Sequence, residues 1–185
     1  MHNILPKVFC FINSYDEKYI KTIPKNIDII YRNYKKKINK NEIYKIKILC
    51  RKKNKKFFIS NNIKIALNMK LDGIYIPSFN KDLKINYFPK KKNFYLLGSA
   101  HNLREIRQKE MQNVDYIFLS PIFLTKKSKN YLGTYKFNSL VKQTKKKIIC
   151  LGGIKKKNLN KIKLLNTYGF SSISLFKQNI RYIRF

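Results

Sequence analysis

The chain has 185 residues with a hydrophobic fraction of 44%, which suffices for one substantial core and is too short for two ordinary domains. No apolar run approaches the ~20 residues of a membrane helix, and residues 1–6 lack the apolar stretch of a secretory signal, so we expect a single-domain cytoplasmic protein over residues 1–185 with no membrane partner. The formal net charge of +33 would suit nucleic acid, but the lysines are spread over nearly every polar segment and no nucleic-acid-binding motif accompanies them.

The chain alternates short β-branched or aromatic runs with polar segments of helical period, which is typical of βα units. In the first half we expect four strands, at Lys7–Ile12, Asn26–Tyr31, Lys56–Ile59 and Gly73–Ile76. The expected helices between them are Tyr15–Thr22, Asn41–Lys52 and Ile63–Lys70. Asn61 or Asn62 is placed to cap the third of these helices.

The second half continues the alternation. Its expected strands are Phe94–Leu97, ending at Gly98–Ser99, then the start of Val114–Thr125, then Lys147–Leu151 and Ser172–Phe176. Its expected helices run from Asn102 to about Gln112, over Lys136–Lys145 and over Asn158–Thr167. Eight such units predict a (β/α)₈ TIM barrel with trimmed helices and loops, because ~250 residues is usual for that fold.

Two of these strands end in residues that suit a functional site. Ser120–Pro121 breaks the strand that begins at Val114, and Gly152–Gly153 follows the next strand. A glycine pair lets a backbone approach an anion closely. Because the C-terminal ends of all barrel strands meet at one face, we expect the site there.

Several stretches together resemble the thiamine-phosphate synthase/TenI family. They are ISNNIKIALNMKLDGIYI at Ile59–Ile76, GSAHNLRE at Gly98–Glu105, DYIFLSPIFLT at Asp115–Thr125 and LGGI at Leu151–Ile154. The resemblance implies a transferase of thiamine biosynthesis that couples a pyrimidine diphosphate to a thiazole phosphate, releases diphosphate and uses Mg²⁺. These two phosphorylated small molecules are then the expected partners, and nucleic acid is not expected to be one.

The resemblance also implies the roles of individual residues. Arg32, at the end of the second strand, and the loop lysines Lys126, Lys127 and Lys129 would hold diphosphate. Ser99 and Thr125 would position the pyrimidine. Gly152 and Gly153 would hold the thiazole phosphate, and Lys177, where the family usually has serine, would add a positive charge near it.

The expected metal positions depart from the family, because its two metal-binding aspartates align with Asn61 and Asn80. Asp82 is the nearby acidic residue that could substitute, while Asp28, Asp72 and Asp115 lie at the opposite ends of strands. Mg²⁺ normally relies on one or two carboxylates together with substrate phosphates. The resemblance therefore leaves three possibilities: Asp82 substitutes and forms a weak Mg²⁺ site with Asn61 and Asn80, the surplus lysines replace the metal, or the reaction is lost.

Two alternatives stay open. A TenI-like or catalytically reduced phosphate-binding barrel would explain the altered metal positions, although the histidine that a TenI tautomerase needs would fall at Pro121. A basic RNA-binding module is the alternative from another class. Codon drift explains the abundance of Lys, Asn, Ile and Tyr without RNA binding.

Overall fold

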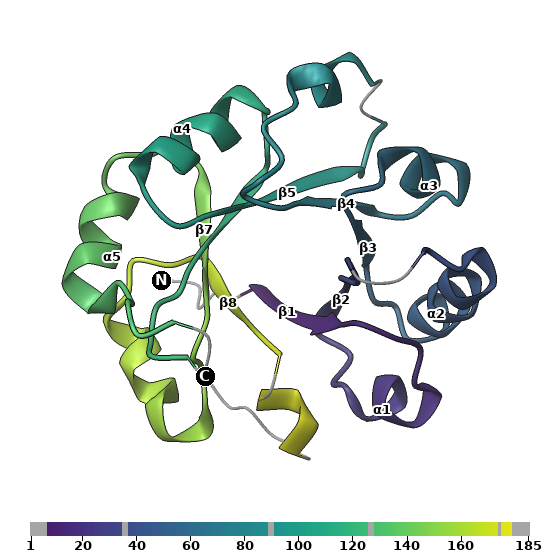
Figure 1. Ribbon diagram of the computed structural model, residues 1–185. Helices are drawn as coiled ribbons and strands as arrows, with labels where there is room; N and C mark the ends of the chain where they lie inside the picture. Colours follow the sequence, from purple (N-terminus) through teal and green to yellow (C-terminus); the bar gives the residue numbers. More distant parts are fainter. Residues whose placement is uncertain (1–6, 35–36, 89–90, 126–127, 174, 179–185) are drawn as a thin grey trace.

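Eight parallel strands pair in chain order and close into one barrel, with helices around the outside (Figure 1). The computed structural model describes residues 7–34, 37–88, 91–125, 128–173 and 175–178. The strands are β1 Lys7–Ile12, β2 Ile27–Tyr31, β3 Phe57–Ser60, β4 Gly73–Ile76, β5 Tyr95–Ala100, β6 Tyr116–Leu119, β7 Lys147–Leu151 and β8 Gly169–Ser172. This topology confirms the predicted (β/α)₈ barrel.

The outer layer consists of short helices. The α-helices are α1 Glu17–Thr22, α2 Lys40–Lys52, α3 Ile63–Asn68, α4 Leu103–Met111 and α5 Gly133–Val141. Three 3₁₀ helices complete it, namely η1 Leu83–Tyr87, η2 Lys156–Leu164 and η3 Leu175–Gln178. Asn62 and Asn102 cap α3 and α4, because their Oδ1 atoms accept the backbone N–H groups of Ile65 and Glu105. None of the described helices is both long and apolar enough to cross a membrane.

Alternation along the strands produces two cores. In β1, Phe9 and Phe11 point into the barrel, while Val8 and Cys10 pack outward against the helices. The interior is largely aromatic: the Phe9 ring centroid lies 5.0 Å from that of Phe118. The barrel centre is therefore filled with side chains and is not a pore. Cys10, Cys50 and Cys150 are buried and form no disulfide with one another.

Aspartates at the N-terminal ends of three strands join neighbouring strands. Asp28 accepts the backbone N–H of Lys56 at 2.9 Å, and Asp72 accepts that of Phe57 at 2.8 Å. Asp115 accepts the N–H of Leu96 at 2.8 Å. These carboxylates lie at the end of the barrel opposite the expected site, as predicted.

Some predicted boundaries are wrong. The last strand is β8, not Ser172–Phe176, because Gly169 lets β8 approach β1 so closely that a Cβ there would lie 1.8 Å from the Lys7 carbonyl oxygen. Strand β5 continues through Gly98 and Ser99 to Ala100, paired with β6. The predicted helix at Asn158–Thr167 is the 3₁₀ helix η2, and α5 lies earlier than Lys136–Lys145.

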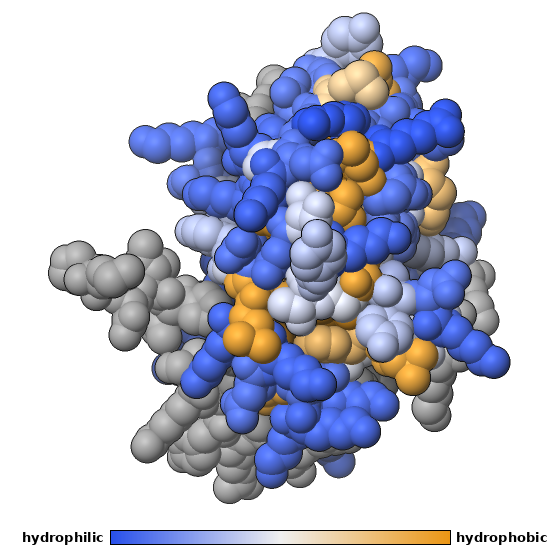
Figure 2. Space-filling view, turned by 90° about the vertical axis from the view of Figure 1, so that its left-hand side faces the viewer, coloured by the Kyte–Doolittle hydropathy of each residue, from blue (hydrophilic) through white to orange (hydrophobic). Residues whose placement is uncertain are grey.

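Charged side chains are not confined to one face. Figure 2 shows the side on which α5 lies, where hydrophilic residues cover most of the surface and hydrophobic ones are scattered. Exposed lysines lie on helices on different sides of the barrel, such as Lys18 on α1, Lys40 on α2, Lys136 on α5 and Lys161 on η2. The wide distribution of lysines in the sequence therefore persists in the structure.

Candidate functional site

Arg32 lies directly after β2, at the C-terminal ends of the strands, and is half-buried there. Its backbone N–H donates to the Ile12 carbonyl at 2.8 Å, which continues the pairing of β1 and β2 past their ends. Its guanidinium carbon lies 4.4 Å from the ring centroid of Phe11, in cation–π geometry. The Phe11 ring of the barrel interior therefore contacts and stabilises the Arg32 guanidinium.

Tyr75 lies near Arg32 and Ser99, below the C-terminal rim of the barrel. Its side chain, on β4, is fully enclosed in the interior, and this burial raises the pKa of its phenol to about 12, while hydrogen bonds from Ser99 and Arg32 act in the opposite direction. Ser99 is itself buried in β5. Arg32 and Ser99 therefore both lie close to the phenol of Tyr75, a residue that the sequence analysis missed.

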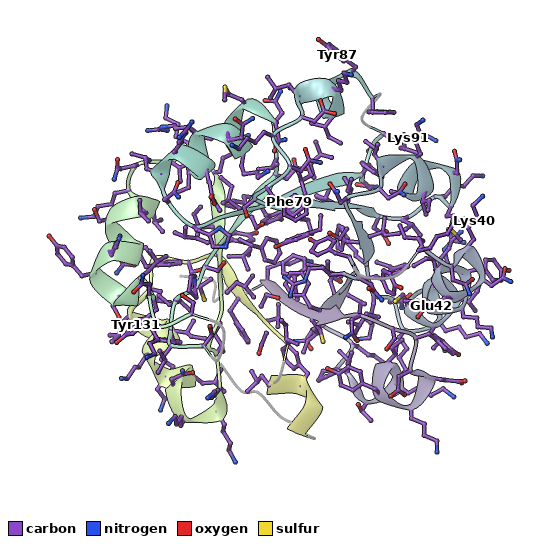
Figure 3. The ribbon with its side chains drawn as sticks, in the orientation of Figure 1. Lys40, Glu42, Phe79, Tyr87, Lys91 and Tyr131 are labelled. Atoms are coloured by element: carbon purple, nitrogen blue, oxygen red, sulfur yellow. The ribbon has the colours of Figure 1, made fainter. Side chains whose placement is uncertain are left out.

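Tyr34 and Phe79 form an exposed aromatic pair at the mouth. They follow β2 and β4, their ring centroids lie 5.4 Å apart in an edge-to-face arrangement, and their exposed fractions are 50% and 62%. The Tyr34 hydroxyl also hydrogen-bonds to Ser60 Oγ at 2.8 Å. In Figure 3, Phe79 lies on the β4–β5 side of the ring of strands. The pair offers a flat ligand an apolar surface.

Asn61, Asn80 and Asp82 come together as the alignment predicts, but they bond to one another. The Asn80 amide donates to Asn61 Oδ1 at 2.6 Å, and Asn80 Oδ1 accepts the Asp82 backbone N–H at 2.9 Å. Asp82 Oδ1 accepts the Lys84 N–H at 2.9 Å and so caps η1. Each of these oxygens already has a donor, and only one carboxylate is present.

These three residues do not fit a Mg²⁺ ion. Mg²⁺ is usually held by one or two carboxylates in near-octahedral geometry, whereas two of the three groups here are neutral amides whose oxygens already accept hydrogen bonds and the one carboxylate caps η1. Within the described residues, no group of three or more His, Cys, Asp or Glu side chains could hold a metal ion. We therefore assign no step of the chemistry to a protein-held metal.

A buried lysine fixes the loop that carries Asn80. Lys109, on α4, is fully buried, and its Nζ donates to the Pro77 carbonyl at 2.9 Å, the Asn80 carbonyl at 2.7 Å and Gln112 Oε1 at 2.7 Å. Gln112 in turn donates to the Asn80 and Asp82 carbonyls at 3.1 and 2.9 Å. Burial lowers the pKa of Lys109 to about 8. The loop geometry at Asn80 thus depends on two side chains of one helix.

Gly152 and Gly153 follow β7 in left-handed backbone conformation, with φ of 96° and 71°. A Cβ at Gly152 would lie 2.8 Å from Pro121, and one at Gly153 would lie 2.5 Å from the Phe123 carbonyl oxygen. The Asn158 amide donates to the Gly153 carbonyl at 2.8 Å. Both positions therefore require glycine for close packing of the loops after β6 and β7, whatever they bind, so a substitution there would not isolate phosphate binding.

The loop after β6 is organised by Thr125. Its Oγ1 accepts the Ser128 N–H at 3.0 Å, so the hydroxyl closes a turn. Lys129 is exposed beside this turn. Lys126, Lys127 and the side chain of Lys177 lie outside the described residues, and their predicted phosphate contacts stay predictions.

His101 has a carboxylate partner. Its Nδ1 lies 2.8 Å from Glu105 Oε2, which also accepts the His101 backbone N–H at 2.8 Å. The two residues are one turn apart at the start of α4. This contact orients the imidazole at the helix N-terminus.

The side chains that the sequence analysis missed had weak signals. Tyr34 stands out only as an aromatic residue two after Arg32, and Phe79 as one next to Asn80. Lys109 follows the buried Ile106 by three residues, so a helical projection places it on the apolar face of α4. A lysine at such a position is a signal of a buried, hydrogen-bonded ammonium.

Comparisons with known proteins agree with this geometry. The family described as thiamine monophosphate synthase matches residues 21–176. A thiamine-phosphate synthase of Pelagibacter ubique is 30% identical over 177 residues, covering 92% of this chain and 84% of that protein. One of Prochlorococcus marinus subsp. pastoris is 30% identical over 154 residues, covering 80% of this chain but only 43% of its own length.

The fold agrees as well. The structure of a thiamine phosphate pyrophosphorylase from Pyrococcus furiosus superposes with a TM-score of 0.75 at 19% identity, covering 95% of this chain and 90% of that one. At that identity the likeness shows the barrel alone. Since the family match extends over most of the sequence, from α1 to η3, the chain belongs to the thiamine monophosphate synthase (TMP-TENI) family.

Proposed function

We propose that this protein is a thiamine-phosphate synthase, which joins a hydroxymethylpyrimidine diphosphate to a thiazole phosphate and releases diphosphate. Membership of the family and the names of its relatives support the reaction. The observation that carries the proposal is the position of Arg32, a half-buried cation supported by Phe11 and Tyr75 at the mouth. The chain spans less than half of the Prochlorococcus relative, so the activity is inferred for this barrel.

The reaction needs charge stabilisation more than proton transfer. The bond between the pyrimidine methylene carbon and the diphosphate oxygen breaks, and the oxygen keeps the electron pair. The lone pair of the thiazole nitrogen forms the new carbon–nitrogen bond, which leaves that nitrogen quaternary with no proton to remove. A general base is therefore not required, and a fixed cation near the departing diphosphate is the main demand.

The residues at the mouth meet this demand in separate ways. The guanidinium of Arg32 can form two parallel hydrogen bonds to diphosphate oxygens. The aromatic pair Tyr34–Phe79 suits the flat pyrimidine. Gly152 and Gly153, in the loop after β7, lie where barrels commonly bind phosphate and are proposed to receive the thiazole phosphate.

The metal requirement is proposed to be weak, because Asn61 and Asn80 bring no charge and bond to each other. Mg²⁺ would then reach the site mainly on the diphosphate of the substrate. The weak metal requirement would also suit the second candidate function, a catalytically reduced barrel that binds thiazole phosphate without turnover. The two differ in one measurement, the formation of thiamine phosphate.

The test is a coupling assay with both substrates, on the wild type, Arg32→Ala and an exposed control, Lys136→Ala. Loss of Arg32 is expected to lower the rate about 100-fold or more, the usual cost of one transition-state donor, while the control stays at the wild-type rate. An unchanged rate in Arg32→Ala would remove this residue from the mechanism. Thiazole phosphate binding without product in the wild type would favour the reduced barrel.

A further inference from the structure

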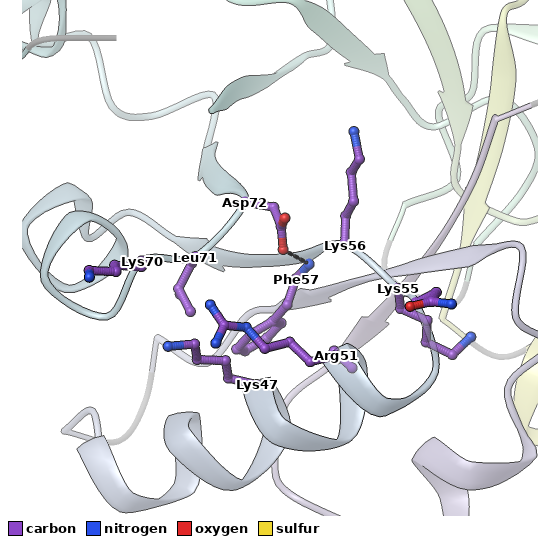
Figure 4. Close-up of a pocket in the computed structure, with 10 residues that line it drawn as sticks. Lys47, Arg51, Lys55, Lys56, Phe57, Lys70, Leu71 and Asp72 are labelled. Carbon is purple, nitrogen blue, oxygen red and sulfur yellow. Dashed lines mark hydrogen bonds between the residues drawn. The ribbon is translucent and has the colours of Figure 1, made fainter. Parts of the chain in front are cut away.

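A basic cavity lies at the other end of the barrel, away from the mouth. It has a volume of about 320 Å³ and is lined by residues at the end of α2 and just before β3 and β4, so it lies at the N-terminal ends of the strands (Figure 4). Its charged lining residues are Lys47, Arg51, Lys55, Lys56, Lys70 and Asp72. Arg32 lies at the opposite, C-terminal ends of the strands.

The charge of this cavity is unbalanced. Five cationic residues and one carboxylate line it, a formal surplus of four positive charges. The carboxylate of Asp72 is also engaged, since its Oδ2 accepts the Phe57 N–H at 2.8 Å. The remaining acidic residues do not line the cavity, so its positive charges are not neutralised from within.

Lys47 and Arg51 are the cations best placed to receive a ligand. They lie one turn apart on α2, where two like charges destabilise a helix, and in Figure 4 both side chains extend toward Leu71. The pKa of Lys47 is lowered by burial and then by the charges of Arg51 and Lys70. These cations therefore repel one another, and a bound anion would turn this repulsion into attraction.

Two of the three remaining lysines, Lys55 and Lys56, have other partners. The Nζ of Lys55 donates to the carbonyl oxygens of Pro24 and Ile27. Lys56 Nζ lies 3.9 Å from the ring centroid of Tyr95, in cation–π geometry. These lysines add to the positive potential, while Arg51 and Lys47 remain for direct contact.

We propose that this cavity binds a small phosphate-bearing anion, with the Arg51 guanidinium as a two-point ligand and Lys47 as a point charge. An arginine fork matches two phosphate oxygens, and a lysine adds attraction without directionality. The volume is at the lower end for small-molecule sites and suits phosphate or diphosphate. Phe57 and Leu71 supply an apolar wall that would also accept part of a nucleotide.

The test is a titration of the full-length ¹⁵N-labelled protein at constant ionic strength with inorganic phosphate, sodium diphosphate and ADP in separate arms. The proposal expects saturable shifts of the backbone amides at 51–57 and 70–72. Lys47→Gln combined with Arg51→Gln is expected to weaken this binding by about ten-fold or more, which is 1.4 kcal/mol or more. Tighter binding of ADP than of diphosphate would assign the site to a nucleotide. Equal affinity for the two would assign it to the inorganic anion.

The control pair Lys136→Gln and Lys161→Gln removes the same two positive charges from exposed positions and is expected to leave the affinity unchanged. Thermal melting of both double variants establishes that each is folded. Shifts that rise linearly at all surface lysines, or equal losses in both double variants, would overturn the proposal and show only an ionic atmosphere. Shifts of the backbone amides at 152–153 report binding at the C-terminal end of the barrel, and they are expected in both double variants. Loss of the shifts at 51–57 and 70–72 alone would therefore concern this cavity and not the proposed function.

Discussion

Replacing Lys109 by methionine tests whether a buried ammonium fixes the mouth of the barrel. The change keeps the length of the side chain but removes three donated hydrogen bonds. The Pro77 carbonyl keeps the Asn80 N–H at 3.1 Å, and the Asn80 carbonyl keeps the Gln112 amide at 3.1 Å. Gln112 Oε1 is left without the lysine donor, which costs about 1–3 kcal/mol.

Two further effects act in opposite directions. The two remaining carbonyls lose charge-assisted bonds, while the cost of burying an ammonium disappears. We therefore expect a net loss of about 2–4 kcal/mol in the free energy of unfolding, measured by urea denaturation. Amide hydrogen exchange at 77–82 is expected to accelerate, because the anchor of that loop is gone.

The matched control is Lys136→Met on α5, an exposed lysine, where a change within about 0.5 kcal/mol is expected. A Lys109→Met variant as stable as the wild type, with unchanged exchange at 77–82, would refute the anchoring role. It would mean that desolvation of the ammonium cancels its hydrogen bonds.

Three other changes have defined outcomes. Burial lowers the pKa of Lys55 from 10.5 to about 8. Between these pH values the unfolded chain binds more protons than the folded one, so the free energy of unfolding rises with pH, by up to about 3 kcal/mol. Urea denaturation at pH 7.5 and 10 should show this rise in the wild type and its loss in Lys55→Met. Gly169→Ala should lower the free energy of unfolding by about 3 kcal/mol or more, because its Cβ would lie 1.8 Å from a β1 carbonyl oxygen. The control Gly133→Ala, whose Cβ would lie 4.0 Å from the nearest described atom outside the adjacent residues, should lose only the ~1–2 kcal/mol of a left-handed backbone. Thermal melting compares the two variants. Asn61→Asp combined with Asn80→Asp should increase the Mg²⁺ dependence of the coupling rate, measured with Mg²⁺ and with chelator, and strong Mg²⁺ dependence in the wild type would contradict our interpretation of these positions.

Strand positions were predictable where periodicity and residue type agree. β1, β4 and β7 match their predicted bounds, because each is a β-branched or aromatic run between polar segments. β8 was misplaced because its sequence, GFSS, is small and polar, and it is a strand only through pairing with β1 and β7. Tertiary contacts overrode the local propensity there.

The sequence predicts at which strand ends the candidate site residues lie, but it does not predict which side chains contact one another. The family resemblance puts Arg32, Asn61 and Asn80 at strand ends, and the structure has them after β2, β3 and β4. It does not reveal that the two asparagines bond to each other or that Tyr75 lies near Arg32 and Ser99. Such contacts depend on side-chain directions that a linear pattern does not contain.

The pairing of β1 with β8 constrains how the chain can fold. Ser171 donates to the Phe9 carbonyl at 2.9 Å across 162 residues of sequence, so the ring closes only after nearly all of the described chain has been synthesised. Until then β1 and β7 each have an open edge, and exposed edges can pair with other chains. Contacts of such long sequence separation also form slowly. During synthesis the chain therefore passes through a stage with two open strand edges. The net charge of +33 would then limit association between unfinished chains, because like charges repel.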